Sequence, residues 1–296
     1  MVAAPLTGFN PDGTVNLAII PRYAEMLKAN GMTGVFINGT TGEGMSLTNE
    51  ERRVVAKRWV EAANGLRVII HVGHACQADS QELAVHALKI GADGMAEIGP
   101  IFFRPQTIEA LVEYTAVTAA SAPELPYYYY HMPSMNQVLF PIHEYLNLAG
   151  EVIPNLAGIK FTHDDITDFD QCIKHADGKF DMLFGRDEFL LDGLKAGAIG
   201  AVGSTYNIMS RLYLELIKAF QNNDLKRAEE LQKISADICK CLHNSGGFGS
   251  GLKYIMRIIG IELGYMRRPQ TNLSKHEGEE LGASLEALGL FKYLNQ

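Results

Sequence analysis

Cysteine is scarce in this chain of 296 residues, which has only Cys76, Cys172, Cys239 and Cys241. The last two lie two positions apart in a predicted helix, where their side chains point in different directions and cannot share a zinc ion. The other two are far apart in the sequence. Free thiols are typical of a reducing compartment, so we expect a cytoplasmic protein.

Long apolar runs and an excess of positive charge are also missing. No stretch of about 18 apolar residues occurs, and the first residues show no basic segment followed by an apolar one, so we expect neither a membrane-spanning helix nor a secretion signal. The net charge of -8 argues against nucleic acid or an anionic membrane as the main partner. With 47% hydrophobic and 20% charged residues, the chain can form a large core.

Short apolar runs alternate with segments of helical periodicity along much of the chain. Alternation through eight units predicts the α/β class and a TIM (β/α)8 barrel, because each crossover between parallel strands covers the sheet with a helix. An open doubly wound sheet is the alternative. The eight expected strands are Val2-Ala4, Gly34-Ile37, Val68-Val72, Gly94-Ile98, Tyr127-Tyr130, Gly158-Phe161, Met182-Phe184 and Ala201-Gly203.

Beyond the last expected strand the pattern contains helices with no strands between them. These helices are expected at residues 206–219, 224–242, 252–261 and 275–288. We therefore expect a barrel over residues 1–205 and a C-terminal helical extension over residues 206–296. The extension includes the last barrel helix and is expected to pack with the barrel as one unit.

Local signals mark the starts of two earlier helices. Thr48 precedes Glu51 by three residues, which is the spacing of a capping box. Ser80 stands before Gln81 and indicates another helix start.

Lys160 lies near the end of one expected strand. Alternation along the strand places Leu156, Gly158 and Lys160 on the same face, which leaves the amine with few polar neighbours. Such surroundings lower the pKa of a lysine from about 10.4 towards neutrality, and a neutral amine is a nucleophile towards ketones. A lysine that reaches past the strand end into water is the alternative interpretation.

Polar groups follow two other expected strands, where barrel enzymes build their active sites. The second strand runs into residues 39–43, Gly-Thr-Thr-Gly-Glu, whose hydroxyls and backbone N–H groups suit a carboxylate, although an ordinary glycine turn has the same composition. The fifth strand ends in four tyrosines, and period two sends Tyr128 and Tyr130 inward and Tyr127 and Tyr129 to the helix layer. A phenol beside a lysine can relay protons.

These motifs occur in order in a known family. Residues 39–43, Tyr130 followed by Pro133, and Gly158-Ile159-Lys160 together resemble the pyruvate-dependent class I aldolases, which include dihydrodipicolinate synthase and N-acetylneuraminate lyase. The similarity extends over essentially the whole chain. Within the family, the tyrosine-rich strand and residues 184–188 and 203–207 are most similar to the N-acetylneuraminate lyases, animal forms in particular.

The resemblance implies a homotetramer that reversibly cleaves N-acetylneuraminate to N-acetyl-D-mannosamine and pyruvate without a metal or organic cofactor. Lys160 would form a covalent Schiff base with the substrate, Tyr130 would relay the proton of the C4 hydroxyl, and Thr40 and Thr41 would hold the carboxylate. By the same resemblance the sugar is bound by Thr162, Gly185, Asp187, Glu188 and Ser204. The two adjacent acids could equally be a helix N-terminal pair that the helix dipole favours.

Three positions depart from the family pattern. Met135 stands where the synthases carry an arginine for the carboxylate of their second substrate, which argues against aspartate semialdehyde. Phe103 stands where a neighbouring subunit often offers a tyrosine, so a relay through that phenol is in doubt. Gly8 follows Thr7 where proline is frequent, and we expect it to alter only a turn.

Three other functions are compatible with the sequence. His71, His74 and Glu97 follow or end two strands and suggest a metal-dependent class II aldolase, although the two histidines would face opposite sides of the strand. Another pyruvate-dependent aldolase of the family would act on a 2-keto-3-deoxy sugar acid. A non-catalytic pyruvate or sugar sensor would bind without turnover, but the nucleophile and the phenol are both present.

Overall fold

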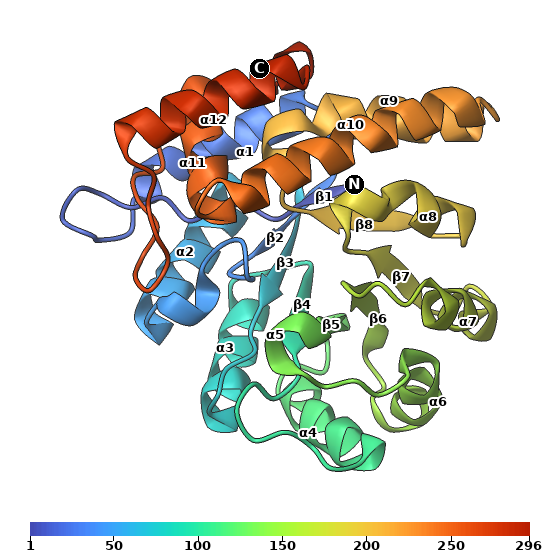
Figure 1. Ribbon diagram of the computed structural model, residues 1–296. Helices are drawn as coiled ribbons and strands as arrows, with labels where there is room; N and C mark the ends of the chain where they lie inside the picture. Colours follow the sequence, from blue (N-terminus) through green and yellow to red (C-terminus); the bar gives the residue numbers. More distant parts are fainter. The chain divides into compact units, whose positions relative to one another are not determined.

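The computed structural model describes residues 1–296, apart from the side chain of Ala176. Eight strands follow one another around a closed barrel in the order of the sequence (Figure 1), which confirms the TIM barrel and excludes the open sheet. The strands are β1 Val2–Ala3, β2 Gly34–Ile37, β3 Arg67–His71, β4 Gly94–Ile98, β5 Tyr127–His131, β6 Leu156–Phe161, β7 Asp181–Phe184 and β8 Gly200–Gly203.

Helices follow the strands as expected, and the end of the chain is helical. The helices that alternate with strands are α1 Ile20–Ala29, α2 Asn49–Ala62, α3 Gln77–Lys89, α4 Ile108–Ala120, α5 Pro133–Asn136, α6 Ile142–Val152, α7 Ile166–Ala176 and α8 Leu190–Lys195. The last helices are α9 Tyr206–Gln221, α10 Leu225–Asn244, α11 Phe248–Ile258 and α12 Lys275–Ala287. Among the described residues, none of these helices has the length and apolar character needed to cross a bilayer.

Packing divides the chain into two compact units, neither of which is continuous in the sequence. The first unit comprises Met1–Leu66, Asp187–Leu191 and Gly203–Gln296, and the second comprises Arg67–Arg186 and Asp192–Val202. The division expected from the sequence, residues 1–205 against 206–296, stays a prediction.

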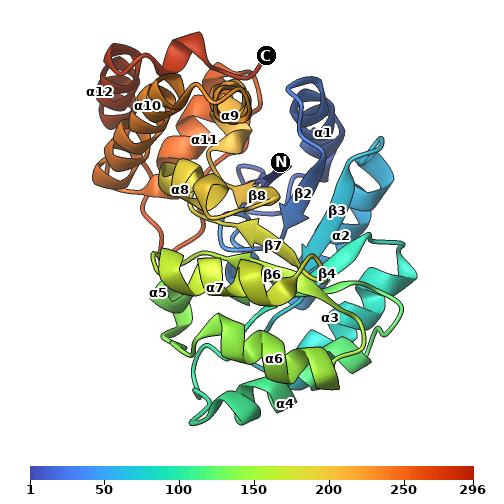
Figure 2. The ribbon, with the colours of Figure 1, turned by 90° about the vertical axis from the view of Figure 1, so that its right-hand side faces the viewer.

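The second unit holds strands β3 to β7, whose outward side chains pack on helices. The rings of Tyr129 on β5 and Tyr145 on α6 lie 4.5 Å apart, and those of Phe161 on β6 and Phe169 on α7 lie 5.2 Å apart. Figure 2 shows α6 and α7 beside these strands. Odd-numbered positions of β5 and β6 therefore supply the core between sheet and helices, as period two predicts.

A register shift between β5 and β6 decides which residue stands opposite Tyr130. Tyr127 pairs with Leu156 but Tyr128 pairs with Gly158, so one residue of β6 is skipped and Tyr130 pairs with Lys160. A Cβ atom at Gly158 would overlap the carbonyl oxygen of Asp181 on β7, so this position requires glycine.

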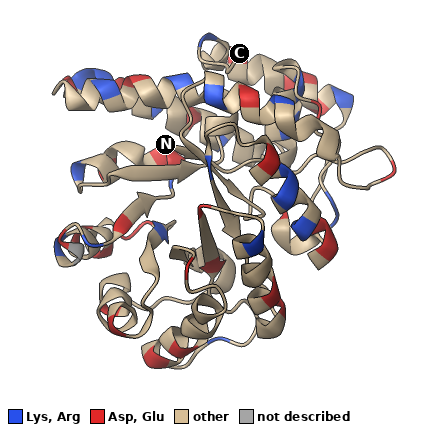
Figure 3. Cartoon of the chain, turned by 180° about the vertical axis from the view of Figure 1, so that it is seen from behind, with Lys and Arg blue, Asp and Glu red and all other residues tan. Residues whose placement is uncertain are grey.

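The first unit contains the last four helices. Helix α10 packs against α9, α11 and α12, and the rings of Tyr206 and Tyr213 on α9 lie 4.7 Å apart. Basic and acidic residues are interspersed along these helices (Figure 3). Figure 2 shows the group in orange and red.

One of the two local helix-start predictions is confirmed and the other is wrong. Thr48 caps α2, and the side chains of Thr48 and Glu51 bond reciprocally to backbone N–H groups as a capping box. Helix α3 begins at Gln77, so Ser80 lies inside it. The Ser80 hydroxyl is buried and accepts a hydrogen bond from the backbone N–H of His74 at 2.9 Å, which explains a serine in the first turn.

Candidate active site

Lys160 and Tyr130 lie together on the inner face of adjacent strands. The Lys160 side chain is buried, and its Nζ atom lies 3.9 Å from the centre of the Tyr130 ring. Lys160 therefore does not extend into solvent, and the alternative interpretation of this lysine is wrong. An amine and a phenol in contact can divide the work of a nucleophile and a proton carrier.

Two neighbours of Tyr130 were not predicted for the Schiff-base site, although His71 was considered as a metal ligand. The Tyr130 hydroxyl donates a hydrogen bond to Sδ of Met132 at 2.8 Å. The ring of His71 on β3 stands edge-on to the Tyr130 ring at 6.0 Å, and its Nε2 accepts from the N–H of Ile98 at 3.1 Å. Met132 follows Tyr130 by two residues, so period two could have placed it here; His71 comes from another strand.

The adjacent tyrosines of β5 have structural roles on the helix side. The Tyr127 hydroxyl donates to Glu97 at 3.2 Å, and burial raises the pKa of the Tyr127 and Tyr129 phenols. His131 also faces this layer, beside the ring of Phe161, and burial lowers the pKa of its imidazole to about 3. These groups stay neutral near pH 7. The contacts of Tyr129 with Tyr145 on α6 and of Tyr130 with Lys160 confirm the predicted separation of the two faces of β5.

Thr40 and Thr41 form the centre of a tight loop after β2, in the first unit. The N–H of Glu43 donates to the Thr40 carbonyl at 3.1 Å, and the Thr7 hydroxyl donates to the Gly42 carbonyl at 2.6 Å. The hydroxyls of Thr41 and Ser204 are hydrogen-bonded at 2.6 Å. The structure thus brings together one residue predicted for the carboxylate and one predicted for the sugar.

Thr162 and Gly185 meet within the second unit. A Cβ atom at Gly185 would overlap the Thr162 hydroxyl, so glycine is required beside it. The Thr162 Oγ1 atom is buried and has no hydrogen-bond partner among the described residues. A buried hydroxyl without a partner is costly, so a ligand that bonds to this atom would remove the cost.

Asp187 and Glu188 begin a short 3-10 helix, Asp187–Phe189, in the first unit. One carboxylate oxygen of Asp187 accepts from the N–H of Thr205 at 2.8 Å and from its hydroxyl at 2.6 Å. Asp187 is therefore tied to the start of α9. The acid pair also stands at a helix start, so both interpretations of these residues stay open.

The metal-dependent alternative does not fit the structure. Glu97 accepts hydrogen bonds from Thr118 on α4 and from Tyr127, on the helix side of the sheet, whereas His71 faces inward. His74 lies beyond β3, and its Nδ1 accepts from the N–H of Cys76 at 3.0 Å. No group of three potential metal ligands occurs among the described side chains.

The three departures from the family pattern occupy separate places. Met135 lies in α5 and Phe103 in the loop after β4, and their exposed fractions are 56% and 85%. The Phe103 ring stands edge-on to that of Phe102 at 4.9 Å. Gly8 lies close to the side chain of Ile19.

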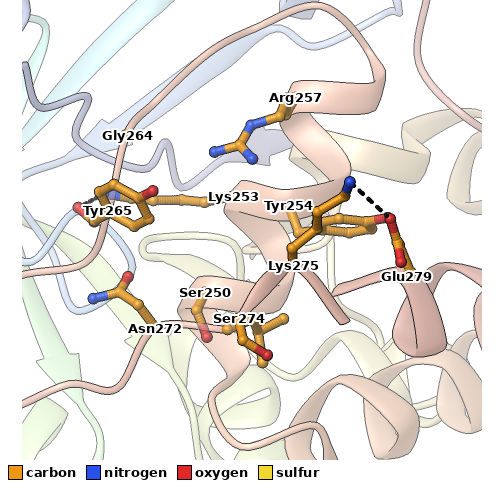
Figure 4. A pocket seen from close by; sticks show the side chains of 11 residues that line it. Ser250, Lys253, Tyr254, Arg257, Gly264, Tyr265, Asn272, Ser274, Lys275 and Glu279 are labelled. Atoms are coloured by element: carbon orange, nitrogen blue, oxygen red, sulfur yellow. Dashed lines mark hydrogen bonds and ion pairs between the residues drawn. The ribbon is translucent and has the colours of Figure 1, made fainter. Parts of the chain in front are cut away.

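A cavity of about 350 Å³ lies beside α11 and the start of α12, and the predicted site residues do not line it. Figure 4 shows Lys253, Arg257 and Lys275 around it. Each of these cations has an acidic partner: Glu43 at 3.0 Å, Glu262 at 2.7 Å and Glu279 at 3.8 Å. The positive groups are therefore satisfied within the protein and do not indicate an anion site.

The family comparison agrees with this fold and with a buried lysine against a tyrosine at its strand ends. Residues 1–288 match the model of the Dihydrodipicolinate synthetase family, and the chain belongs to this family.

Individual relatives and solved structures are similar to this chain over nearly its whole length. The chain is 42% identical to the N-acetylneuraminate lyase of Mus musculus, over 97% of this chain and 92% of that protein. The solved N-acetylneuraminate lyase of Proteus mirabilis has 41% identity and a TM-score of 0.94, over 98% of both chains. A solved sialic acid aldolase of Ruminococcus gnavus, a catalytic lysine mutant, has 26% identity and a TM-score of 0.92, over 98% of this chain and 96% of that chain.

Proposed function

We propose that this protein is a class I aldolase that reversibly cleaves N-acetylneuraminate to N-acetyl-D-mannosamine and pyruvate. The observation that carries the proposal is the buried Lys160 amine 3.9 Å from the Tyr130 ring. The names of relatives at about 40% identity over nearly the whole chain support this substrate. Met135 in place of the synthase arginine argues against a synthase.

Lys160 begins the reaction as a nucleophile. Its neutral amine adds to the C2 ketone of the open-chain sugar acid, and loss of water leaves a protonated imine. The C3–C4 bond then breaks, and its electron pair moves into the imine to give an enamine. The imine nitrogen thus takes up the electrons that the bond releases.

Tyr130 carries the proton that this step sets free. As the C3–C4 bond breaks, the C4 hydroxyl becomes the aldehyde of N-acetyl-D-mannosamine. Its proton passes to the Tyr130 hydroxyl, which relays it. The enamine is protonated at C3, and water releases pyruvate and restores the amine. In the synthetic direction the same steps run backward.

Binding is assigned to loops at the strand ends. Thr40 and Thr41 hold the carboxylate of the pyruvyl group, which suits hydroxyl donors on a tightly bonded loop. The sugar end of the substrate is bound by the residues predicted for it, Thr162, Gly185, Asp187, Glu188 and Ser204. The unpartnered Thr162 hydroxyl supports this assignment because a sugar hydroxyl would satisfy it.

We also propose the cofactor use, the assembly and the location of the enzyme. The covalent Schiff base on Lys160 replaces an external cofactor, and the substrates are small molecules. We propose a homotetramer in the cytoplasm, in agreement with free thiols at all four cysteines.

A substrate panel tests the proposal. Pyruvate release is measured from N-acetylneuraminate, its N-glycolyl analogue and 2-keto-3-deoxygluconate, with Lys160→Ala as the blank. Release from N-acetylneuraminate that Lys160→Ala abolishes supports the proposal. Release from 2-keto-3-deoxygluconate alone indicates a sugar-acid aldolase, and binding of pyruvate without turnover of any substrate indicates a sensor.

A further inference from the structure

The loop that carries Thr40 and Thr41 ends at a glutamate in an unusual conformation. Glu43 has a φ of 55° in the left-handed region, and Asn38 at the other end of the loop has a φ of 58°. Glutamate adopts this region infrequently, and such backbone persists where the surroundings hold it. A Cβ atom at the next residue, Gly44, would overlap the Asn38 carbonyl oxygen, so the loop closes tightly on itself.

The C-terminal segment holds the Glu43 carboxylate on both oxygens. Oε1 lies 3.0 Å from Nζ of Lys253 on α11, and Oε2 accepts the backbone N–H of Arg267 at 2.8 Å. The exposed fractions of the Lys253 and Glu43 side chains are 3% and 0%. Lys253 also donates to the Tyr265 carbonyl at 2.8 Å, and Figure 4 shows its side chain extending from α11 toward Tyr265.

Arg267 makes a second connection to the same part of the chain. Its guanidinium donates to the Ser46 carbonyl at 2.9 Å and to Glu51 at 2.7 Å, just after the loop. All of these residues belong to the first unit. The loop after β2 is therefore fastened to the C-terminal segment at its last residue and again a few residues later.

A buried ion pair is weak evidence for stability, because desolvation of both charges offsets their attraction. Burial lowers the pKa of the Lys253 ammonium, and the Glu43 charge works in the opposite direction. Such a pair does, however, fix geometry, because each group is confined to the direction of its partner. The pair here fixes the residue that follows Thr40, Thr41 and Gly42.

We propose that Glu43, held by Lys253 and by the backbone of Arg267, is a positioning residue that sets the carboxylate-binding loop. This inference rests on the proposed function, since it takes Thr40 and Thr41 as the groups that bind the pyruvyl carboxylate. Release of Glu43 lets its backbone leave the left-handed region and moves the Thr40–Glu43 turn. Carboxylate binding then weakens, while the chemistry at Lys160 and Tyr130 is kept.

The test measures pyruvate trapping by borohydride on purified full-length protein. Lys253→Met removes the charge and keeps most of the side chain's bulk, and Lys253→Arg keeps the charge. Lys275→Met is the matched control, because Lys275 lies beside the same cavity but pairs with Glu279 at an exposed site. Each variant gives a pyruvate concentration for half-maximal trapping and a maximal trapping rate.

If Glu43 positions the carboxylate-binding loop, the half-maximal concentration changes and the maximal rate does not. In Lys253→Met the half-maximal concentration rises by roughly 10- to 100-fold, the scale of one lost hydrogen bond to the charged carboxylate of pyruvate, while the maximal rate changes less than about threefold. Lys253→Arg restores most of the affinity, and Lys275→Met behaves as wild type. Should Lys253→Met fail to fold, the double change Lys253→Met with Glu43→Gln removes both buried charges and is expected to show the same loss of affinity.

The experiment distinguishes failure of the Glu43 positioning role from failure of the proposed function. An unchanged half-maximal concentration in a folded variant, or a fall in the maximal rate alone, overturns the positioning role. If the wild-type protein itself traps no pyruvate, the proposed function fails first.

Discussion

Replacement of Tyr130 by phenylalanine separates the two tasks assigned to the site. The aromatic ring that lies 3.9 Å from the Lys160 amine remains, so the surroundings of the nucleophile change little. The hydroxyl, with its bond to Met132 Sδ, is lost. Loss of a positioned proton carrier lowers rates by about 10² to 10⁴, which raises the barrier by roughly 3 to 5 kcal/mol.

The assay compares cleavage with trapping in the same preparation. We expect kcat for N-acetylneuraminate cleavage to fall by about 10² to 10⁴, whereas borohydride with pyruvate still modifies Lys160. Tyr129→Phe is the control, because it removes the same atom one residue earlier on the helix side of β5, where burial keeps the phenol neutral. Cleavage by Tyr130→Phe within about threefold of wild type, or an equal loss in Tyr129→Phe, would refute the proton-carrier role.

Two predictions concern the dependence of stability on pH. Contact with Arg267 lowers the pKa of Glu51 from 4.5 to about 2, so this carboxylate stabilises the fold above pH 4.5 and the contribution disappears as the pH falls towards 2. Because solvent screens this partly exposed pair, urea unfolding should show Glu51→Gln less stable than wild type by about 1 kcal/mol at pH 7 and by less at pH 3; a stability difference independent of pH would contradict this. Burial lowers the pKa of His131 from 6.5 to about 3, so its contribution is complete above pH 6.5 and is lost as the pH falls towards 3. Between pH 7 and 5 the wild type should lose about 2 kcal/mol more than His131→Phe, as measured by parallel unfolding curves; equal losses would show that His131 does not titrate on unfolding.

Much of the fold was readable because local periodicity and packing agree. Period two along β5 separates Tyr129 from Tyr130, and the structure places them on opposite faces, one against Tyr145 and the other against Lys160. The bounds of β2 and β4 are those expected, and those of the other six strands differ by one or two residues. The strands could be located in the sequence because most of their residues are buried, which gives short apolar runs.

The features that the sequence did not predict depend on contacts between distant segments. Nothing local at Glu43 indicates Lys253 or Arg267, because a glutamate in a glycine-rich turn is usually solvated. The register shift beside Tyr127 likewise follows from the fit of two strands. The sequence predicts a helix start at Ser80 because a serine side chain suits a cap. The hydrogen bond from the His74 backbone N–H to the Ser80 hydroxyl shows why this serine lies inside the helix instead.

The central claim is that the Lys160 amine forms the covalent bond to substrate. The most direct measurement is reduction with borohydride in the presence of pyruvate, followed by mass mapping of the peptides. We predict one adduct, on Lys160, that is absent without pyruvate and absent in Lys160→Ala. An adduct on another lysine, or no adduct at saturating pyruvate, would contradict the assignment.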